Sequence, residues 1–170
     1  MTGRGPCYLR WVRSWIIGIT LVVLSVGTVQ AQAPADPGRL EGSLSVHGLR
    51  REDSSKTWPG GGFGLALHGR RVALAGEGTI TRRDGHNDWH ARVGPRFALV
   101  TTTRTRVFLQ LLAGTVIRQK DARLSSQLAG GLDINLNTRA WVRVQLAGLL
   151  DQTEGDAVTG GRVSIGIVIR

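Results

Sequence analysis

The feature that most constrains this chain is the alternation of apolar and polar residues along nearly every segment after residue 39. In the last segment every second residue is apolar and β-branched, at Val163, Ile165, Ile167 and Ile169. A period of two places successive side chains on opposite faces of a β-strand. No comparable stripe with the helical period of about 3.6 residues follows residue 31. The sequence therefore predicts an all-β chain.

Eight segments alternate in this way. The segment 124–136 does so for thirteen residues, whereas strands in small soluble domains usually have about five or six. A tilted strand that spans a bilayer needs about nine to eleven residues. The eight predicted strands are 40–48, 62–69, 71–81, 89–100, 106–118, 124–136, 139–150 and 162–170.

The connections between these segments differ in length. Those at 50–60, 82–88 and 151–160 are long, whereas 69–70 and 137–138 are tight. An antiparallel meander with long polar loops at one end and tight turns at the other explains this order, and transmembrane barrels have that shape. The charged segment 50–58 is accordingly interpreted as a solvated loop. The fold class that follows is an eight-stranded antiparallel up-and-down transmembrane β-barrel.

Alternation alone leaves open which face lies inside the barrel. A soluble periplasmic barrel would keep its apolar residues inside and bind a small hydrophobic ligand, whereas a transmembrane barrel turns them toward lipid. The polar face carries small residues that would ease crowding in a narrow lumen, at Gly62, Gly64, Gly131 and Gly166. This favours the transmembrane arrangement.

The polar face also carries charges of both signs, which could be buried only if they are paired. We expect them to form a charge network in the lumen. Its members are Glu41, Glu77, Arg92, Arg96, Arg106, Asp133, Arg143 and Arg162. Because eight strands enclose a space just wide enough for side chains, these residues predict a plugged lumen and no open channel.

The first thirty-one residues have the order of a secretory signal peptide. Arg4, Arg10 and Arg13 precede the apolar run 16–26, and Val29-Gln30-Ala31 offers a small-x-small cleavage site. An uncleaved membrane anchor is the alternative. The predicted organisation is a signal peptide at 1–31, a short linker at 32–39 and an outer-membrane barrel at 40–170.

Loss of the signal peptide would remove three of the 22 basic residues and none of the 12 acidic ones, which lowers the net charge from +10 to +7. The remaining basic residues are spread along the chain instead of forming the clustered face that nucleic-acid binding requires. No nucleic-acid partner is expected. The single cysteine, Cys7, excludes a disulfide framework or a cysteine-based zinc site downstream.

Signals for catalysis or cofactors are weak. The segment 84–90 contains two histidines and two aspartates, but Gly85 and Asn87 are read more simply as turn residues. Ser43, Ser45 and His47 share one strand face, yet no Gly-x-Ser-x-Gly is present. The glycine-rich run 60–64 precedes no helix that could bind phosphate. We predict no enzyme, no metal and no cofactor.

Four strand patterns carry a resemblance to a known family. They are Val93-Gly94-Pro95-Arg96-Phe97, Val107-Phe108-Leu109 with Leu112-Ala113-Gly114, Ala129-Gly130-Gly131-Leu132-Asp133, and Arg162 to Val168. Over residues 40–170 the chain resembles the small bacterial outer-membrane β-barrel proteins of the eight-stranded, porin-like type. Such proteins usually end in an aromatic residue, whereas this chain ends in Ile169-Arg170.

The resemblance implies a cell-envelope protein of a Gram-negative-type bacterium, located in the outer membrane. It implies contact with outer-membrane lipid, insertion by the barrel-assembly machinery, and a monomer with a structural or surface-interaction role. The soluble periplasmic barrel with an apolar ligand is the alternative function.

Overall fold

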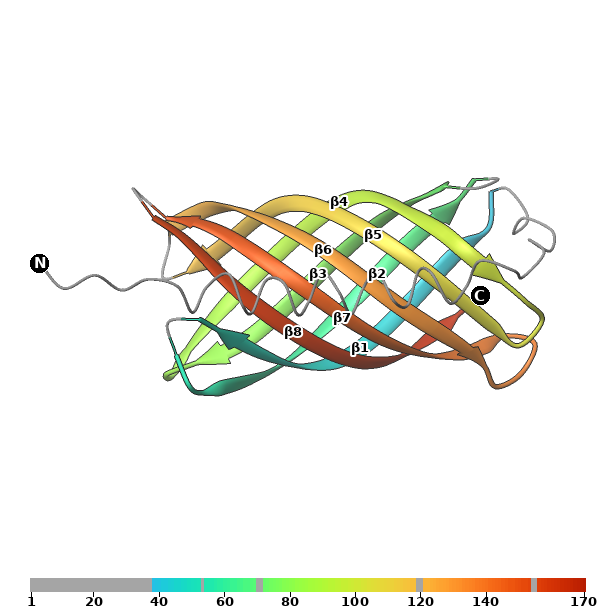
Figure 1. Ribbon diagram of the computed structural model, residues 1–170, viewed down its shortest axis with the longest axis horizontal. Helices are drawn as coiled ribbons and strands as arrows, with labels where there is room; N and C mark the ends of the chain where they lie inside the picture. The colour runs from blue at the N-terminus through green and yellow to red at the C-terminus, as the bar shows by residue number, and fades with distance from the viewer. Residues whose placement is uncertain (1–37, 53, 70–71, 119–120, 154–155) are drawn as a thin grey trace, which may run out of the picture. The chain divides into compact units, whose positions relative to one another are not determined.

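The computed structural model describes residues 38–52, 54–69, 72–118, 121–153 and 156–170, which form one closed antiparallel barrel (Figure 1). Each strand pairs with its neighbours in chain order, and the first strand closes against the last through pairs such as Leu44 with Ile167. The strands are β1 (Leu40–Arg51), β2 (Thr57–His68), β3 (Val72–Arg83), β4 (His86–Thr101), β5 (Thr105–Arg118), β6 (Asp121–Asn135), β7 (Ala140–Thr153) and β8 (Asp156–Ile169). The predicted all-β, eight-stranded meander is confirmed. The predicted signal peptide at 1–31 and most of the predicted linker lie outside the described residues.

The predicted difference in loop length between the two ends is wrong. Only residues 52–56 separate β1 from β2, and two residues each separate β3 from β4, β5 from β6 and β7 from β8. The strands continue through the polar segments. Backbone pairing between neighbouring strands extends to Arg82 with Asn87 and to Gln152 with Ala157. The position where the alternation of apolar and polar residues stops therefore marks the edge of the apolar outer surface and not the end of the strand.

The β3–β4 turn shows how tight this end is. Asp84 (φ 46°) and Gly85 (φ 85°) both have positive φ angles, which a two-residue hairpin turn of type I′ requires and which Gly adopts without strain. Gly85 is thus a turn residue, as predicted, whereas Asn87 lies in β4. Arg51 and Trp58, at the ends of the predicted solvated loop, are buried inside the barrel.

Large apolar side chains cover the outside of the barrel. Leu44 is 68% exposed and pairs across the sheet with Phe63 and Ile167, which are also exposed. On the far wall, exposed Leu111 pairs with exposed Leu128. An apolar surface of this extent fits lipid and not water. It is the arrangement of a transmembrane barrel, and the reverse of the one that a soluble barrel with an apolar interior requires.

No helix in the described ranges is long and apolar enough to cross a membrane.

The interior is crowded, and the glycines of the polar face fit that crowding. A Cβ atom at Gly62 would lie 2.7 Å from Thr79 Cγ2, and one at Gly64 would lie 2.6 Å from Ser43 Oγ. At Gly131 it would collide with the buried ring of Phe108, whereas at Gly130, on the outer face, it would meet nothing. Small residues therefore occupy inward positions where a larger side chain has no space.

Candidate functional site in the charged lumen

All eight residues of the predicted charge network point into the barrel, and all but the slightly exposed Glu77 are buried. The structure brings them together as two groups instead of one. The first, here called the terminal cluster, lies at the end of the barrel that holds the first residues of β1 and the last residues of β8. Its members are Glu41, His68, Arg96, Arg106, Asp133, Arg143 and Arg170. The second, here called the central cluster, lies about midway along the strands and consists of Glu77, Arg92, Gln127 and Arg162.

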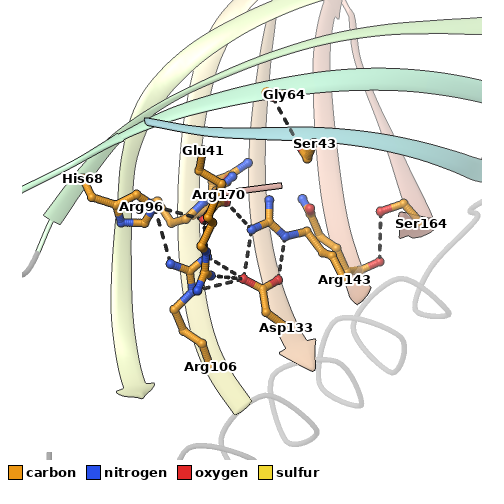
Figure 2. A network of polar contacts seen from close by, with 12 residues as sticks. Glu41, Ser43, Gly64, His68, Arg96, Arg106, Asp133, Arg143, Ser164 and Arg170 are labelled. Carbon is orange, nitrogen blue, oxygen red and sulfur yellow. Dashed lines mark hydrogen bonds and ion pairs between the residues drawn. The ribbon is translucent and has the colours of Figure 1, made fainter. Parts of the chain in front are cut away.

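Two carboxylates organise the terminal cluster (Figure 2). Asp133 accepts hydrogen bonds from Arg106 Nη2 at 2.5 Å and from Arg143 Nε at 2.7 Å. Glu41 accepts from the same two arginines at 2.6 Å each, from β5 and β7. Buried charges are tolerated when they are paired and hydrogen-bonded in this way, and short charge-assisted bonds are the stronger kind.

Further donors surround Glu41. Arg96 Nη1 donates to Glu41 Oε1 at 2.8 Å and Arg170 Nε donates to Oε2 at 3.1 Å. His68 Nε2 lies 3.0 Å from Oε2. Glu41 is therefore the shared acceptor of side chains from β2, β4, β5 and β7 and from the residue after β8.

Aromatic rings hold the guanidinium groups in place. The Arg96 and Arg143 guanidinium carbons lie 4.9 and 4.7 Å from the centre of the Phe108 ring, and that of Arg170 lies 4.0 Å from the Trp141 ring. A cation over an aromatic face is stabilised by the ring quadrupole, more so when it is desolvated. Phe108 interrupts the polar pattern of its strand because it serves this packing role inside the barrel.

The central cluster has one carboxylate. Arg162 Nη2 lies 2.5 Å from Glu77 Oε1, and Arg92 Nη1 lies 4.0 Å from the same atom. Gln127 joins both arginines, because its Oε1 accepts from Arg92 Nη1 at 3.3 Å and from Arg162 Nη2 at 3.0 Å.

A polar chain extends from the central cluster toward the opposite end of the barrel. Arg92 Nε donates to Ser125 Oγ at 2.9 Å, and Ser125 Oγ donates to Asp151 Oδ1 at 2.6 Å. Arg51 Nη2 closes the chain by pairing with Asp151 Oδ2 at 2.5 Å. Polar contacts therefore continue along much of the lumen.

The predicted network omits several residues of these clusters and of the polar chain beyond them. The alternation places His68 and Gln127 on the polar face, but the predicted network omits them. Arg51 and Asp151 share the same inward parity. The predicted long connections 50–60 and 151–160 contain Arg51 and Asp151. The alternation places Arg170 on the polar face of the last strand, but the predicted network omits it, whereas its guanidinium contacts Glu41 and Asp133.

The weaker catalytic and metal candidates have other partners in the structure. Ser43 and Ser45 donate to the backbone oxygens of Gly64 and Gly62, and His47 contacts Thr81. Asp88 pairs with Arg118. Within the described part of the chain, no three His, Cys, Asp or Glu residues are arranged to hold a metal ion.

A comparison with models of known protein families finds no match. A comparison with curated protein sequences finds none either.

Solved structures do resemble this chain. Neisserial surface protein A matches with a TM-score of 0.61 at 8% identity, over 76% of this chain and 94% of the other. Ail, the attachment invasion locus protein of Yersinia pestis, matches with a TM-score of 0.52 at 15% identity, over 78% and 98% of the two chains. A de novo designed transmembrane β-barrel matches with a TM-score of 0.52 at 12% identity, over 80% and 98%. At these identities the likeness concerns the fold, and that fold is the small eight-stranded outer-membrane β-barrel.

Proposed function

We propose that this protein is a non-enzymatic, monomeric outer-membrane β-barrel with a structural or surface-interaction role and a lumen closed to solutes. Export by the segment 1–31 and insertion by the barrel-assembly machinery belong to this proposal. The apolar outer surface supports contact with outer-membrane lipid, because it leaves no polar band at the middle of the strands for water to solvate.

The observation that carries the closed lumen is the contact of charged side chains from opposite walls. Glu41 on β1 and Arg106 on β5 stand four strands apart in the barrel, yet their side chains meet at 2.6 Å. Glu77 on β3 likewise reaches Arg162 on β8, three strands away. An eight-stranded barrel has little interior beyond its side chains, and here those side chains bond to one another across it.

The surface-interaction role rests on the rim opposite the start of β1 and the end of β8. Arg50 and Arg82 have exposed side chains there, beyond the apolar surface, and exposed Lys56 lies 3.7 Å from Asp84. Basic side chains at this level suit the anionic groups of a membrane surface or of a polyanionic partner.

Recordings in planar lipid bilayers test the closed lumen. The protein, folded in detergent and added to the bilayer, is expected to give no conductance steps of porin size, while a general porin added to the same bilayer gives them. Insertion is checked by recovering the protein from the membrane in its folded form. Regular porin-sized steps from the folded protein would contradict the proposal.

A further inference from the structure

The two clusters in the lumen contain more positive than negative side chains. Among the described residues they hold three carboxylates, on Glu41, Glu77 and Asp133, which are shared by six arginines. These are Arg92, Arg96, Arg106, Arg143, Arg162 and Arg170. Two further inward acids in the described part of the chain, Asp151 and Asp88, pair with Arg51 and Arg118 and so leave this excess unchanged. An excess of buried positive charge is costly unless an anion compensates it.

A small cavity of about 20 Å³ lies where the two clusters approach each other, lined by Arg96 and Arg143 of one and by Glu77 and Arg162 of the other. Glycines make room for it, because Gly64 and Gly166 face this space without side chains. A Cβ atom at Gly166 would lie 2.8 Å from Ser45 Cβ.

Two donors at the cavity have no partner. Gln145 Nε2 and Arg162 Nε make no hydrogen bond within the described residues, although their side chains are only 5% and 4% exposed. Unsatisfied buried polar groups are rare in native proteins and call for an explanation. Both groups can only donate. The lining carboxylate oxygen Glu77 Oε1 also makes no hydrogen bond within the described residues, but it is ion-paired with Arg162 Nη2 at 2.5 Å.

Three hydroxyl groups that line the cavity are weakly engaged. Ser43, Ser45 and Ser164 donate to backbone oxygens at 3.4, 3.5 and 3.5 Å, whereas hydroxyl hydrogen bonds normally measure about 2.7–2.8 Å. Figure 2 shows Ser43 and Ser164 on the same side of the terminal cluster as Arg143. A rotating hydroxyl can turn its hydrogen toward an acceptor in the cavity at little cost.

We propose that this cavity binds a single chloride-sized anion, held by Gln145, Arg162 and the serine hydroxyls. A cavity must offer about 10–15 Å³ by this measure to hold one water, so the observed volume suits one particle slightly larger than water and excludes sulfate or phosphate. Water would satisfy some donors but would leave the charge excess unchanged. The inference rests on the closed lumen proposed above and adds a ligand to it.

Unfolding by urea in phospholipid vesicles, followed by tryptophan fluorescence, tests the site. The midpoint is compared in sodium bromide and in sodium gluconate at equal ionic strength, because gluconate is too large for the cavity. A ligand that binds only the folded state shifts the midpoint upward, here by on the order of 0.5 M urea when the site is nearly saturated. Equal midpoints in the two salts would overturn the proposal.

A pair of substitutions on β7 separates the site from general salt effects. Gln145→Glu supplies a carboxylate inside the cavity, and this variant is expected to lose the response to bromide. Gln152→Glu makes the same change at an exposed position of the same strand and is expected to keep the full response. If Gln145→Glu kept the full difference between its urea midpoints in bromide and in gluconate, the proposed anion site would be contradicted.

Crystals of the unaltered protein grown in bromide give a readout that does not depend on any variant. An anomalous bromide peak between Gln145 and Arg162 is expected. A water molecule at that position, without anomalous signal, would contradict the proposal that the cavity binds an anion. The protein could give no conductance steps in bilayers and also show neither the bromide shift of the urea midpoint nor the anomalous peak. That result would contradict the anion site and leave the closed lumen standing.

Discussion

Replacing Glu41 with glutamine is expected to lower the free energy of unfolding by about 3–5 kcal/mol, the usual cost of removing one partner from a buried ion pair. The carboxylate is 1% exposed and accepts hydrogen bonds from four arginines. Without its charge, Asp133 alone would face those four guanidinium groups. The amide also carries two donors where the site offers only donors.

The measurement is urea unfolding in phospholipid vesicles, with Glu52→Gln as the matched control. Glu52 is exposed in the β1–β2 connection, so the same chemical change there is expected to alter stability by less than about 0.5 kcal/mol. If Glu41→Gln and Glu52→Gln had equal effects, the terminal cluster would not contribute to stability as described.

Replacing Leu128 with arginine is expected to destabilise the barrel by about 2–4 kcal/mol in a lipid bilayer, because a charge on the lipid face is most costly at the midplane. Leu128 lies at the middle of β6 on the outer face and pairs with Leu111. Insertion in lipid vesicles should fall in the same variant.

Leu124→Arg gives the control at a different depth. Leu124 is also exposed, on the same face of β6 but four residues nearer the end of the strand, where the cost falls to about 0–1 kcal/mol. A soluble barrel would tolerate arginine equally well at both positions. Equal stability of the two variants would therefore contradict a lipid-facing outer surface.

The period-two pattern was sufficient to predict which residues face the lumen. It assigned Arg92 and Arg96 of β4 to the same face, and both are buried inside. It could not predict that they belong to different clusters. That depends on strand tilt and register, which bring Arg96 close to Glu41, fifty-five positions away in the chain, while Arg92 lies closer to Glu77.

Strand ends were harder to predict than strand faces. The sequence placed 82–88 in a loop because its residues are polar, yet Arg83 pairs with His86 in the ladder and only Asp84 and Gly85 turn. Backbone hydrogen bonds continue a strand regardless of side-chain polarity. For the same reason, Arg51 and Asp151 at the ends of their strands still point inward and pair with each other.

The mobility of the protein on an SDS gel, with and without boiling, tests the central claim most directly. The protein is first extracted from bacterial outer membranes in mild detergent. The account predicts a fast-migrating band in the unboiled sample that slows on boiling, because a closed barrel with a paired interior resists SDS until it is heated. Recovery of the protein in the soluble fraction, with no shift on boiling, would contradict the account.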